Sequence, residues 1–323
     1  MPIDAELIAD RRRLRRKLSF WRVLGIVGAI AAVAAIGAAA AGRVPFPAAQ
    51  NQIARVEIGG FILADQSRMR DLFKRVAEAR NVSGVVVAIN SPGGTTTGAE
   101  ELFRGIRELS EKKPLVAFVD GTAASGGYIT ALAADHIVAR ETSLVGSIGV
   151  LFQYPDVSKL LTTLGVQVEE IKSAPLKAEP SPFHPTSPEA RRALQEVVVD
   201  TFDWFKRLVA ERRRMDEGQV AAVSSGRIFS GRQGVGLKLV DELGGEREAV
   251  AWLEREKSVA KDLPVREWKP RTRRDFDLWT AASLGADLLG FEGLGERLRH
   301  LGVSTRAANL DGLLAVWHPA LEK

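Results

Sequence analysis

The sequence predicts an α/β fold built from βαβ units around a mostly parallel sheet. Apolar, β-branched runs of strand length alternate with segments of helical periodicity through the first half of the chain. Two of these runs are followed closely by Gly-Gly, at 93–94 and at 126–127. Ligand sites of such sheets lie at the carboxyl ends of the strands, so both glycine pairs are predicted to lie at one site.

The first predicted elements follow one another at short spacing. They are a strand at Ile53–Ile62, a helix at Gln66–Arg80, a strand at Val82–Ile89, a helix at Thr97–Ser110, a strand at Leu115–Val119 and a helix at Tyr128–Ala134. Between the second strand and its helix, Asn90-Ser-Pro-Gly-Gly94 is typical of a tight turn.

The second half of the core is less regular. We expect short strands at His136–Ala139, Leu151–Tyr154 and Val166–Ile171, and helices at Asp156–Leu164, from Pro188 to about Arg214 and at Glu246–Glu256. Residues 173–188 contain five prolines and are predicted to be an irregular loop. Ser187-Pro188 is a typical helix start, with serine at the cap and proline in the first turn.

Composition excludes several classes of site. The 323 residues are 46% hydrophobic and 26% charged, which is ordinary for a globular chain. With no cysteine there is no disulfide, thiolate nucleophile or cysteine zinc site. The four histidines are far apart in the sequence, so we expect no metal and no cofactor. The net charge of +5 comes from basic residues in 1–22, and the remainder, close to neutral, indicates no nucleic-acid partner.

The N-terminus is predicted to be a membrane anchor. Residues 23–42 carry no charge, and at ~1.5 Å per residue they would cross a ~30 Å hydrocarbon layer. The basic tail 1–22 would stay in the cytoplasm and the chain after 42 would lie on the far side. A cleaved signal peptide is the alternative, since Ala38-Ala39-Ala40 is similar to a cleavage site. Residues 43–52 are a linker.

Ser125 is the candidate nucleophile. It stands between a strand and a helix and is followed by Gly126 and Gly127, so it is predicted at a helix N-terminus, where free N–H groups favour a developing anion. The alternative interpretation is that Ser125 only caps the helix. Gly93 and Gly94, with the N–H of Gly126, are a candidate oxyanion hole; the alternative is a plain turn.

A serine nucleophile needs a base. His184, in the proline-rich loop, is the only histidine placed to serve. A lysine whose pKa is lowered by burial is the alternative, and Lys177 suits this role because it lies among small and apolar residues just beyond a predicted strand. Lys172 suits it less, being close to Glu169 and Glu170. The alternative interpretation of Lys177 is an exposed loop lysine, which the residue type alone would favour.

Five motifs in this order resemble the signal peptide peptidase A family. They are Ser-Pro-Gly-Gly (91–94), Ala-Ser-Gly-Gly-Tyr (124–128), Gly-Ser-Ile-Gly-Val (146–150), Ser-Ala-Pro-Leu-Lys (173–177) and the run from Gly-Arg-Ile-Phe-Ser-Gly to Leu-Gly-Gly (226–245). The resemblance spans 53–256 and implies a crotonase-like peptidase domain related to the Clp protease core. It implies a Ser125–Lys177 dyad, an oxyanion hole of Gly93 or Gly94 with Gly126, and Ser147 orienting the lysine amine.

The resemblance also implies partners and a location. Short members of the family form homo-oligomeric rings in which one subunit's lysine serves its neighbour's serine, and they clear remnant signal peptides. The expected place is the bacterial inner membrane, with the catalytic domain on the periplasmic side. The acidic residue that often follows the family's lysine is replaced here by Ala178.

Residues 257–323 fall outside the resemblance, as a C-terminal extension of unknown role. Their aromatic residues among arginines suit either a membrane surface or a packing segment. For the whole chain, two competing interpretations are a non-catalytic scaffold that binds peptides or organises membrane proteins, and an acyl-CoA enzyme of the same fold.

Overall fold

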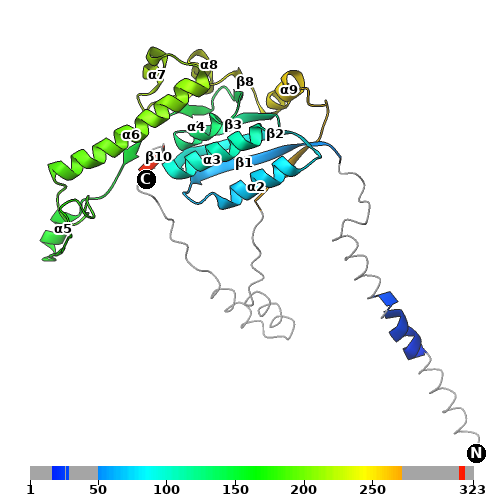
Figure 1. The fold of residues 1–323 in the computed structure, drawn as a ribbon, viewed down its shortest axis with the longest axis horizontal. Helices are drawn as coiled ribbons and strands as arrows, with labels where there is room; N and C mark the ends of the chain where they lie inside the picture. Colours follow the sequence, from blue (N-terminus) through cyan, green and yellow to red (C-terminus); the bar gives the residue numbers. More distant parts are fainter. Residues whose placement is uncertain (1–16, 26, 29–49, 271–312, 317–323) are drawn as a thin grey trace, which may run out of the picture. The chain divides into compact units, whose positions relative to one another are not determined.

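The computed structural model describes residues 17–25, 27–28, 50–270 and 313–316 (Figure 1). The chain divides into two compact units, Met1–Gln50 and Asn51–Lys323. In the first unit, residues 17–25 and 27–28 are helical. Among the described residues no helix has the length and apolar character needed to cross a membrane. Residues 26 and 29–42 of the predicted anchor lie outside the described residues.

The second unit is built on one mixed sheet. Ten described strands take part: β1 (Gln52–Ile62), β2 (Val82–Thr95), β3 (Leu115–Ala124), β4 (Ile137–Ala139), β5 (Leu144–Gly146), β6 (Leu151–Phe152), β7 (Ile228–Ser230), β8 (Glu242–Leu243), β9 (Val265–Trp268) and β10 (Leu313–Val316). The main path runs β6-β10-β2-β3-β4-β8; β1 pairs with β2 and with β9, and β5 pairs with β3 and with β7. All pairs are parallel except those of β10 and β5–β7, which confirms the predicted mostly parallel α/β sheet.

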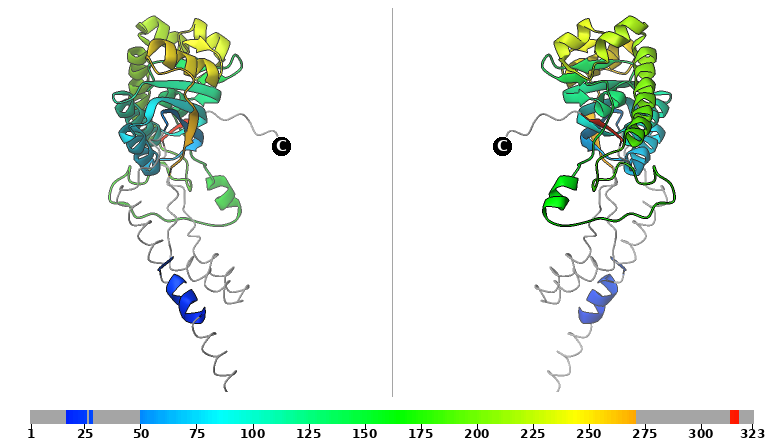
Figure 2. Two further views of the ribbon diagram at one scale, coloured as in Figure 1. Left: turned by 90° about the vertical axis from the view of Figure 1, so that its right-hand side faces the viewer. Right: turned by 90° about the vertical axis from the view of Figure 1, so that its left-hand side faces the viewer.

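Helices cover both faces of the parallel strands (Figures 1 and 2). The described helices of this unit are α2 (Ser67–Glu78), α3 (Thr96–Ser110), α4 (Gly126–Ala131), α5 (Ser158–Thr163), α6 (Pro188–Arg213), α7 (Glu217–Val223), α8 (Gly231–Gly236) and α9 (Glu246–Glu256), of which α5 lies away from the sheet. Along β2, Val85 and Val87 join the core beneath α2, α3 and α4, while Val86 and Ala88 pack with Trp252 of α9. Strands buried on both faces explain the continuous apolar runs in the sequence.

Several elements differ from their predicted bounds. The expected turn Asn90–Gly94 is extended and forms the last part of β2, because β1 pairs with it as far as Ile62↔Gly94. β3 likewise continues beyond Val119 to Ala124, and β5 was not predicted. Neighbouring strands supply the hydrogen bonds that make these glycine-rich segments extended, which local sequence does not reveal.

The predicted strand Val166–Ile171 is wrong. These residues form no strand, and Val166, Val168 and Ile171 are exposed. The alternation of apolar residues is real, but no described strand lies beside it to pair with. The segment carrying α5 extends away from the sheet (Figure 2).

Candidate active site

Ser125 occupies a strained position between β3 and α4. Its φ of 54° and ψ of −115° lie in a region that residues other than glycine rarely adopt. The conformation is held on both sides: the Ser125 N–H donates to Gly146 O at 2.8 Å, and Ser125 O accepts from the N–H groups of Tyr128 and Ile129. Backbone strain of this kind, ~1–3 kcal/mol, persists only where the surrounding structure imposes it.

The Ser125 side chain does not cap the helix. Ser125 is at the N-cap position of α4, yet its hydroxyl makes no capping hydrogen bond, and none to another described residue. The residue is 1% exposed. The alternative that Ser125 serves only as a cap is therefore disfavoured, and the hydroxyl is left without a structural role in the described part of the chain.

Helix α4 is short and packs closely against β2. A Cβ on Gly127 would lie 2.6 Å from Ser91 O, so only glycine allows this approach of α4 to β2. Burial raises the pKa of Tyr128 far above its ordinary value, and its neutral phenol donates to Leu239 O at 2.9 Å. The first N–H groups of α4, at Gly126 and Gly127, have no partner within the helix and point out from its N-terminus.

The two glycines of β2 are not equivalent. The Gly93 N–H donates to the Ser91 hydroxyl at 3.1 Å, and that hydroxyl donates to Gly60 O at 2.7 Å. Gly93 itself has a φ of 106°. Gly94 packs so closely that a Cβ there would lie 2.0 Å from Ile62 O. The N–H of Gly93 is thus engaged by Ser91, while Gly94 pairs with Ile62 of β1 and with Ala315 of β10.

Ser147 lies beside Ser125 in the sheet. β3 pairs with β5 up to Ala124↔Gly146, so the two serines follow directly after the last paired residues. Ser147 is buried, has a φ of 52°, and its N–H donates to Arg227 O at 2.9 Å. The turn at Ser147 is thus held from the side of β7, which pairs with β5 through Val145↔Phe229 and directly follows Arg227.

Lys177 is not brought to Ser125 within one chain. It is exposed, in the irregular segment between α5 and α6, and its amine makes no hydrogen bond or ion pair with any residue that the structure describes. The Ser125 hydroxyl has none either, so the two are not hydrogen-bonded. A single chain, over its described residues, places no base against the serine.

A cluster of polar side chains lies where the two ends of the segment that carries Lys177 come together. The Lys172 amine lies 2.6 Å from carboxylate oxygens of both Glu170 and Glu179, and the Ser181 hydroxyl donates to Glu170 at 2.9 Å. His184 Nε2 lies 3.4 Å from the same two carboxylates. We call these five residues the clasp. It joins residues 170–172 to residues 179–184 and so closes the loop that has Lys177 between its ends.

The clasp makes Lys172 and His184 poor candidates for the base. Hydrogen bonds to Glu170 and then Glu179 raise the pKa of Lys172, which keeps the amine protonated. The bonds from Lys172 and Ser181 lower the pKa of Glu170 to about 2. The Glu170, Glu179 and His184 ligand atoms lie within 4.8 Å of one another and could hold a cation. Lys172 already supplies the positive charge between the two carboxylates.

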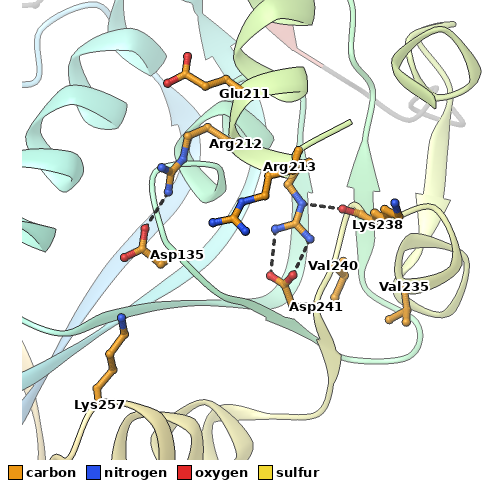
Figure 3. Close-up of a pocket in the computed structure, with 10 residues that line it drawn as sticks. Asp135, Glu211, Arg212, Arg213, Val235, Lys238, Val240, Asp241 and Lys257 are labelled. Carbon is orange, nitrogen blue, oxygen red and sulfur yellow. Dashed lines mark hydrogen bonds and ion pairs between the residues drawn. The ribbon is translucent and has the colours of Figure 1, made fainter. Parts of the chain in front are cut away.

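A cavity of about 920 Å³ is lined by Asp135, Arg212, Arg213 and Asp241, among others (Figure 3). Arg212 donates there to Leu132 O and to Asp135, while Arg213 pairs with Asp241 through two hydrogen bonds. Burial opposes ionisation of Asp135, but the Arg212 and Arg107 guanidiniums outweigh it and lower the pKa of Asp135. Arg212 thus joins the end of α6 to the end of α4, and Arg213 joins it to the segment before β8. None of the predicted site residues lines this cavity.

Sequence reasoning missed two residues that position the site. Ser91 is fully buried and links the Gly93 N–H to Gly60 O. Asn90 accepts from the Thr122 N–H at 3.1 Å and so joins β2 to β3 where they approach the glycines. Asn90 and Ser91 are two polar residues directly after an apolar strand, and this pattern could have indicated that their side chains bond to nearby backbone.

The chain is similar to known peptidases. The model of "Peptidase family S49" matches residues 107–260. A candidate protease of Methanocaldococcus jannaschii is 38% identical over 180 residues, 56% of this chain and 58% of that protein. A candidate protease of Synechocystis is 34% identical over 209 residues, 64% of this chain and 76% of that protein. A protein of Enterococcus faecium, named as a candidate signal peptide peptidase SppA, is 35% identical over 222 residues, 68% of this chain and 63% of that protein.

The matched stretches thus span less than two thirds of the Methanocaldococcus and Enterococcus proteins and three quarters of the Synechocystis one. In this chain the family model begins in α3 and ends just after α9. It therefore includes Ser125, Ser147 and Lys177, but not Gly93 and Gly94.

Proposed function

Because the chain belongs to peptidase family S49, the signal peptide peptidase A family, we propose that it is a serine protease with Ser125 as its nucleophile. One observation carries this proposal. Ser125 is held at φ 54° at the N-terminus of α4, and its hydroxyl is neither a cap nor bonded to any described residue. A strained serine without a structural role beside free N–H groups is suited to nucleophilic attack.

The base in this proposal is Lys177 of a neighbouring subunit. The exposure of Lys177 and its lack of a described partner support an arrangement in which the amine meets Ser125 only after assembly. Lys172 and His184, the other candidates, are engaged in the clasp. Burial at the interface would favour the neutral form of the amine, which is the form that a base must have.

The reaction then follows from the placement of the groups. The neutral Lys177 amine takes the Ser125 proton as Oγ bonds to the substrate carbonyl carbon, and the N–H groups of Gly94 and Gly126 stabilise the resulting oxyanion. The protonated amine gives its proton to the leaving nitrogen as the peptide bond breaks. Water, deprotonated by the same amine, hydrolyses the acyl-enzyme. Ser147, beside Ser125, would orient the amine.

We further propose a crotonase-like core in the Clp protease class, a homo-oligomeric ring, a membrane anchor at 23–42, and remnant signal peptides as substrates. The uncharged run and the basic tail support the anchor. Extraction of membranes with alkaline carbonate tests it: the full chain should stay in the membrane, and a variant lacking residues 1–42 should not.

The deciding experiment is hydrolysis of an apolar signal-sequence peptide by the full chain in detergent. Wild type should cleave, and Ser125→Ala and Lys177→Ala should each lose at least about 10³ in rate while still assembling. Lys159→Met, an exposed lysine of α5, is the matched control and should keep full activity. Activity retained by Lys177→Ala would disprove the dyad. An inert but assembled wild type would favour the non-catalytic scaffold.

A further inference from the structure

Lys177 lies in a loop that has little structure of its own. Residues 173–178, which we call the lysine loop, form a series of bends and turns. The Lys177 N–H donates to Ala174 O at 3.0 Å, and the Glu179 N–H donates to Leu176 O at 3.3 Å. Ordering each residue of a chain costs conformational entropy, and local hydrogen bonds of this kind offset only part of that cost for the whole loop. Contacts outside the lysine loop must therefore fix its shape.

The clasp supplies such contacts at the two ends of the lysine loop. The Lys172 amine, directly before the loop, lies 2.6 Å from a carboxylate oxygen of Glu179, directly after it. The same amine lies 2.6 Å from Glu170, and the Ser181 hydroxyl donates to Glu170 at 2.9 Å. Hydrogen bonds between ionised groups are roughly twice as strong as neutral ones. The bonds Lys172–Glu179 and Ser181–Glu170 thus join the residues before the loop to those after it.

Burial distinguishes the clasp from an ordinary surface ion pair. The side chains of Glu179 and Lys172 are only 8% and 19% exposed, and Ser181 is 2% exposed. Ion pairs on the surface contribute little to stability, whereas a covered carboxylate that loses its partner is strongly destabilised. Lys172 lies between the two carboxylates, so it also offsets the repulsion between Glu170 and Glu179. Loss of the Lys172 charge should therefore open the clasp.

The clasp is connected in turn to the sheet. The Val157 N–H, just before α5, donates to Pro182 O at 2.8 Å. The hydroxyls of Tyr154 and Thr186 lie 2.7 Å apart. Tyr154 and Val157 follow closely after β6, which belongs to the sheet. The lysine loop is therefore joined through the clasp, and through these two hydrogen bonds, to a strand of the core.

We propose that Lys172, Glu179 and Ser181 are positioning residues for Lys177, which hold the lysine loop in the shape that presents its amine to Ser125 of the partner subunit. This inference rests on the proposed function. Proton transfer needs the amine within hydrogen-bonding reach of the serine, and a misplacement of about 1 Å can cost about 10² in rate. Opening the clasp therefore lowers kcat and leaves KM nearly unchanged, because the groups proposed to bind the substrate lie in β2 and α4.

The test compares Lys172→Met with Lys172→Arg in the full chain. Lys172→Met should lower kcat about 10²-fold, with KM within about twofold of wild type and with assembly, measured by sedimentation, unchanged. Lys172→Arg keeps a charge that can donate to both carboxylates, so kcat should recover to within about tenfold of wild type. Lys159→Met, an exposed lysine of α5 outside the clasp, is the matched control and should keep full activity.

A milder variant covers the case in which Lys172→Met does not assemble. Ser181→Ala removes one bond that joins the two ends of the lysine loop and leaves both bonds of Lys172. It should lower kcat about tenfold at unchanged KM. An assembled Ser181→Ala protein with the kcat of wild type would contradict the inference.

Hydrogen exchange separates this inference from the protease proposal. In an inactive Ser125→Ala background, the amides of residues 174–179 should exchange at least about tenfold faster with Lys172→Met than with Lys159→Met. Equal exchange, or an assembled Lys172→Met protein with the kcat of wild type, would overturn the inference and leave the dyad standing. Full activity of Lys177→Ala would overturn both. An inert wild type that still shows the exchange difference would reject the protease alone and leave the clasp holding the loop.

Discussion

At the scale of single residues, the site is distinguished by two serines in left-handed backbone conformations. Ser125 and Ser147 have φ values of 54° and 52° and follow adjacent, paired strands. Neither hydroxyl forms a hydrogen bond with another described residue. A conformation that costs free energy and brings the side chain no structural partner points to a chemical role for that side chain.

The strain at Ser125 predicts that the protein is more stable with glycine at this position than with alanine. Ser125→Gly removes the nucleophile but tolerates the left-handed conformation, whereas Ser125→Ala removes the nucleophile and keeps the strain. We expect the glycine variant to be more stable than the alanine variant by about 1 kcal/mol. Urea unfolding of the two inactive proteins measures the difference. An alanine variant of equal or higher stability would show that the conformation is not strained.

Glu170 predicts how the clasp depends on pH. Its pKa is lowered to about 2 by Lys172, then Ser181, so its ionisation favours the closed clasp. This contribution is complete above the ordinary glutamate pKa of ~4.3 and is lost as the pH falls towards about 2. Hydrogen exchange of the 165–187 amides, corrected for intrinsic rates, should show protection falling over that range in wild type.

Glu170→Gln is the comparison for that measurement. Its protection in the same segment should already be lower at pH 7 and should change less between pH 5 and pH 2.5, about the ends of the titration range. Glu189→Gln, an exposed glutamate in the first turn of α6, is a control that should resemble wild type. A Glu170→Gln profile identical to that of wild type would mean that the clasp does not hold the segment.

At the scale of elements, close backbone contacts fix the position of β2 and α4. Gly94 packs against Ile62 O of β1, and Gly127 packs against Ser91 O of β2. These contacts leave no room for a Cβ and bring the free N–H groups of α4 close to the glycine end of β2. The proposed oxyanion site would therefore depend on the placement of a strand and a helix more than on any side chain.

Gly94→Ala should disrupt this placement. Its Cβ would lie 2.0 Å from Ile62 O, so β1 and β2 must separate, at a cost of at least about 2 kcal/mol and a loss of about 10² or more in kcat. Gly59→Ala in β1 is the control, since a Cβ there meets its nearest atoms at 3.7 Å. Thermal unfolding and peptide hydrolysis measure both effects. A Gly94→Ala protein as stable as Gly59→Ala would refute the packing argument.

At the scale of the whole molecule, one chain carries both halves of the proposed dyad without joining them. Ser125 is buried beside the sheet, while Lys177 is exposed on a segment that extends away from it (Figures 1 and 2). An active site completed by assembly accounts for both facts, because the lysine then loses water only when a neighbour covers it.

Mixing two inactive proteins tests this arrangement. Ser125→Ala still has Lys177, and Lys177→Ala still has Ser125, so a mixed ring contains some complete sites. We expect activity to return when the two are unfolded, mixed and reassembled, and to remain absent when either is treated alone. If mixtures stay inactive while wild type survives the same treatment, serine and lysine act within one chain.

The sequence by itself determined the parallel α/β core, the place of Ser125 between a strand and a helix, and the family. Apolar runs buried on both faces, such as Val85–Ile89, identify strands of a parallel sheet, and the glycines after Ser125 mark a close approach of backbone. These features depend on local periodicity and on residue size, which a single sequence displays.

Only the tertiary structure decided how β2 ends and what lies beside it. Gly93 and Gly94 belong to a strand because β1 pairs with them, and β10 joins that strand from more than two hundred residues away in the sequence. The pattern of Val166–Ile171 is typical of a strand, but these residues form none, because the pattern does not show whether a partner strand is present. Strand pairing depends on a partner's backbone, and neither the partner nor its register is encoded in the local pattern of the residues that pair.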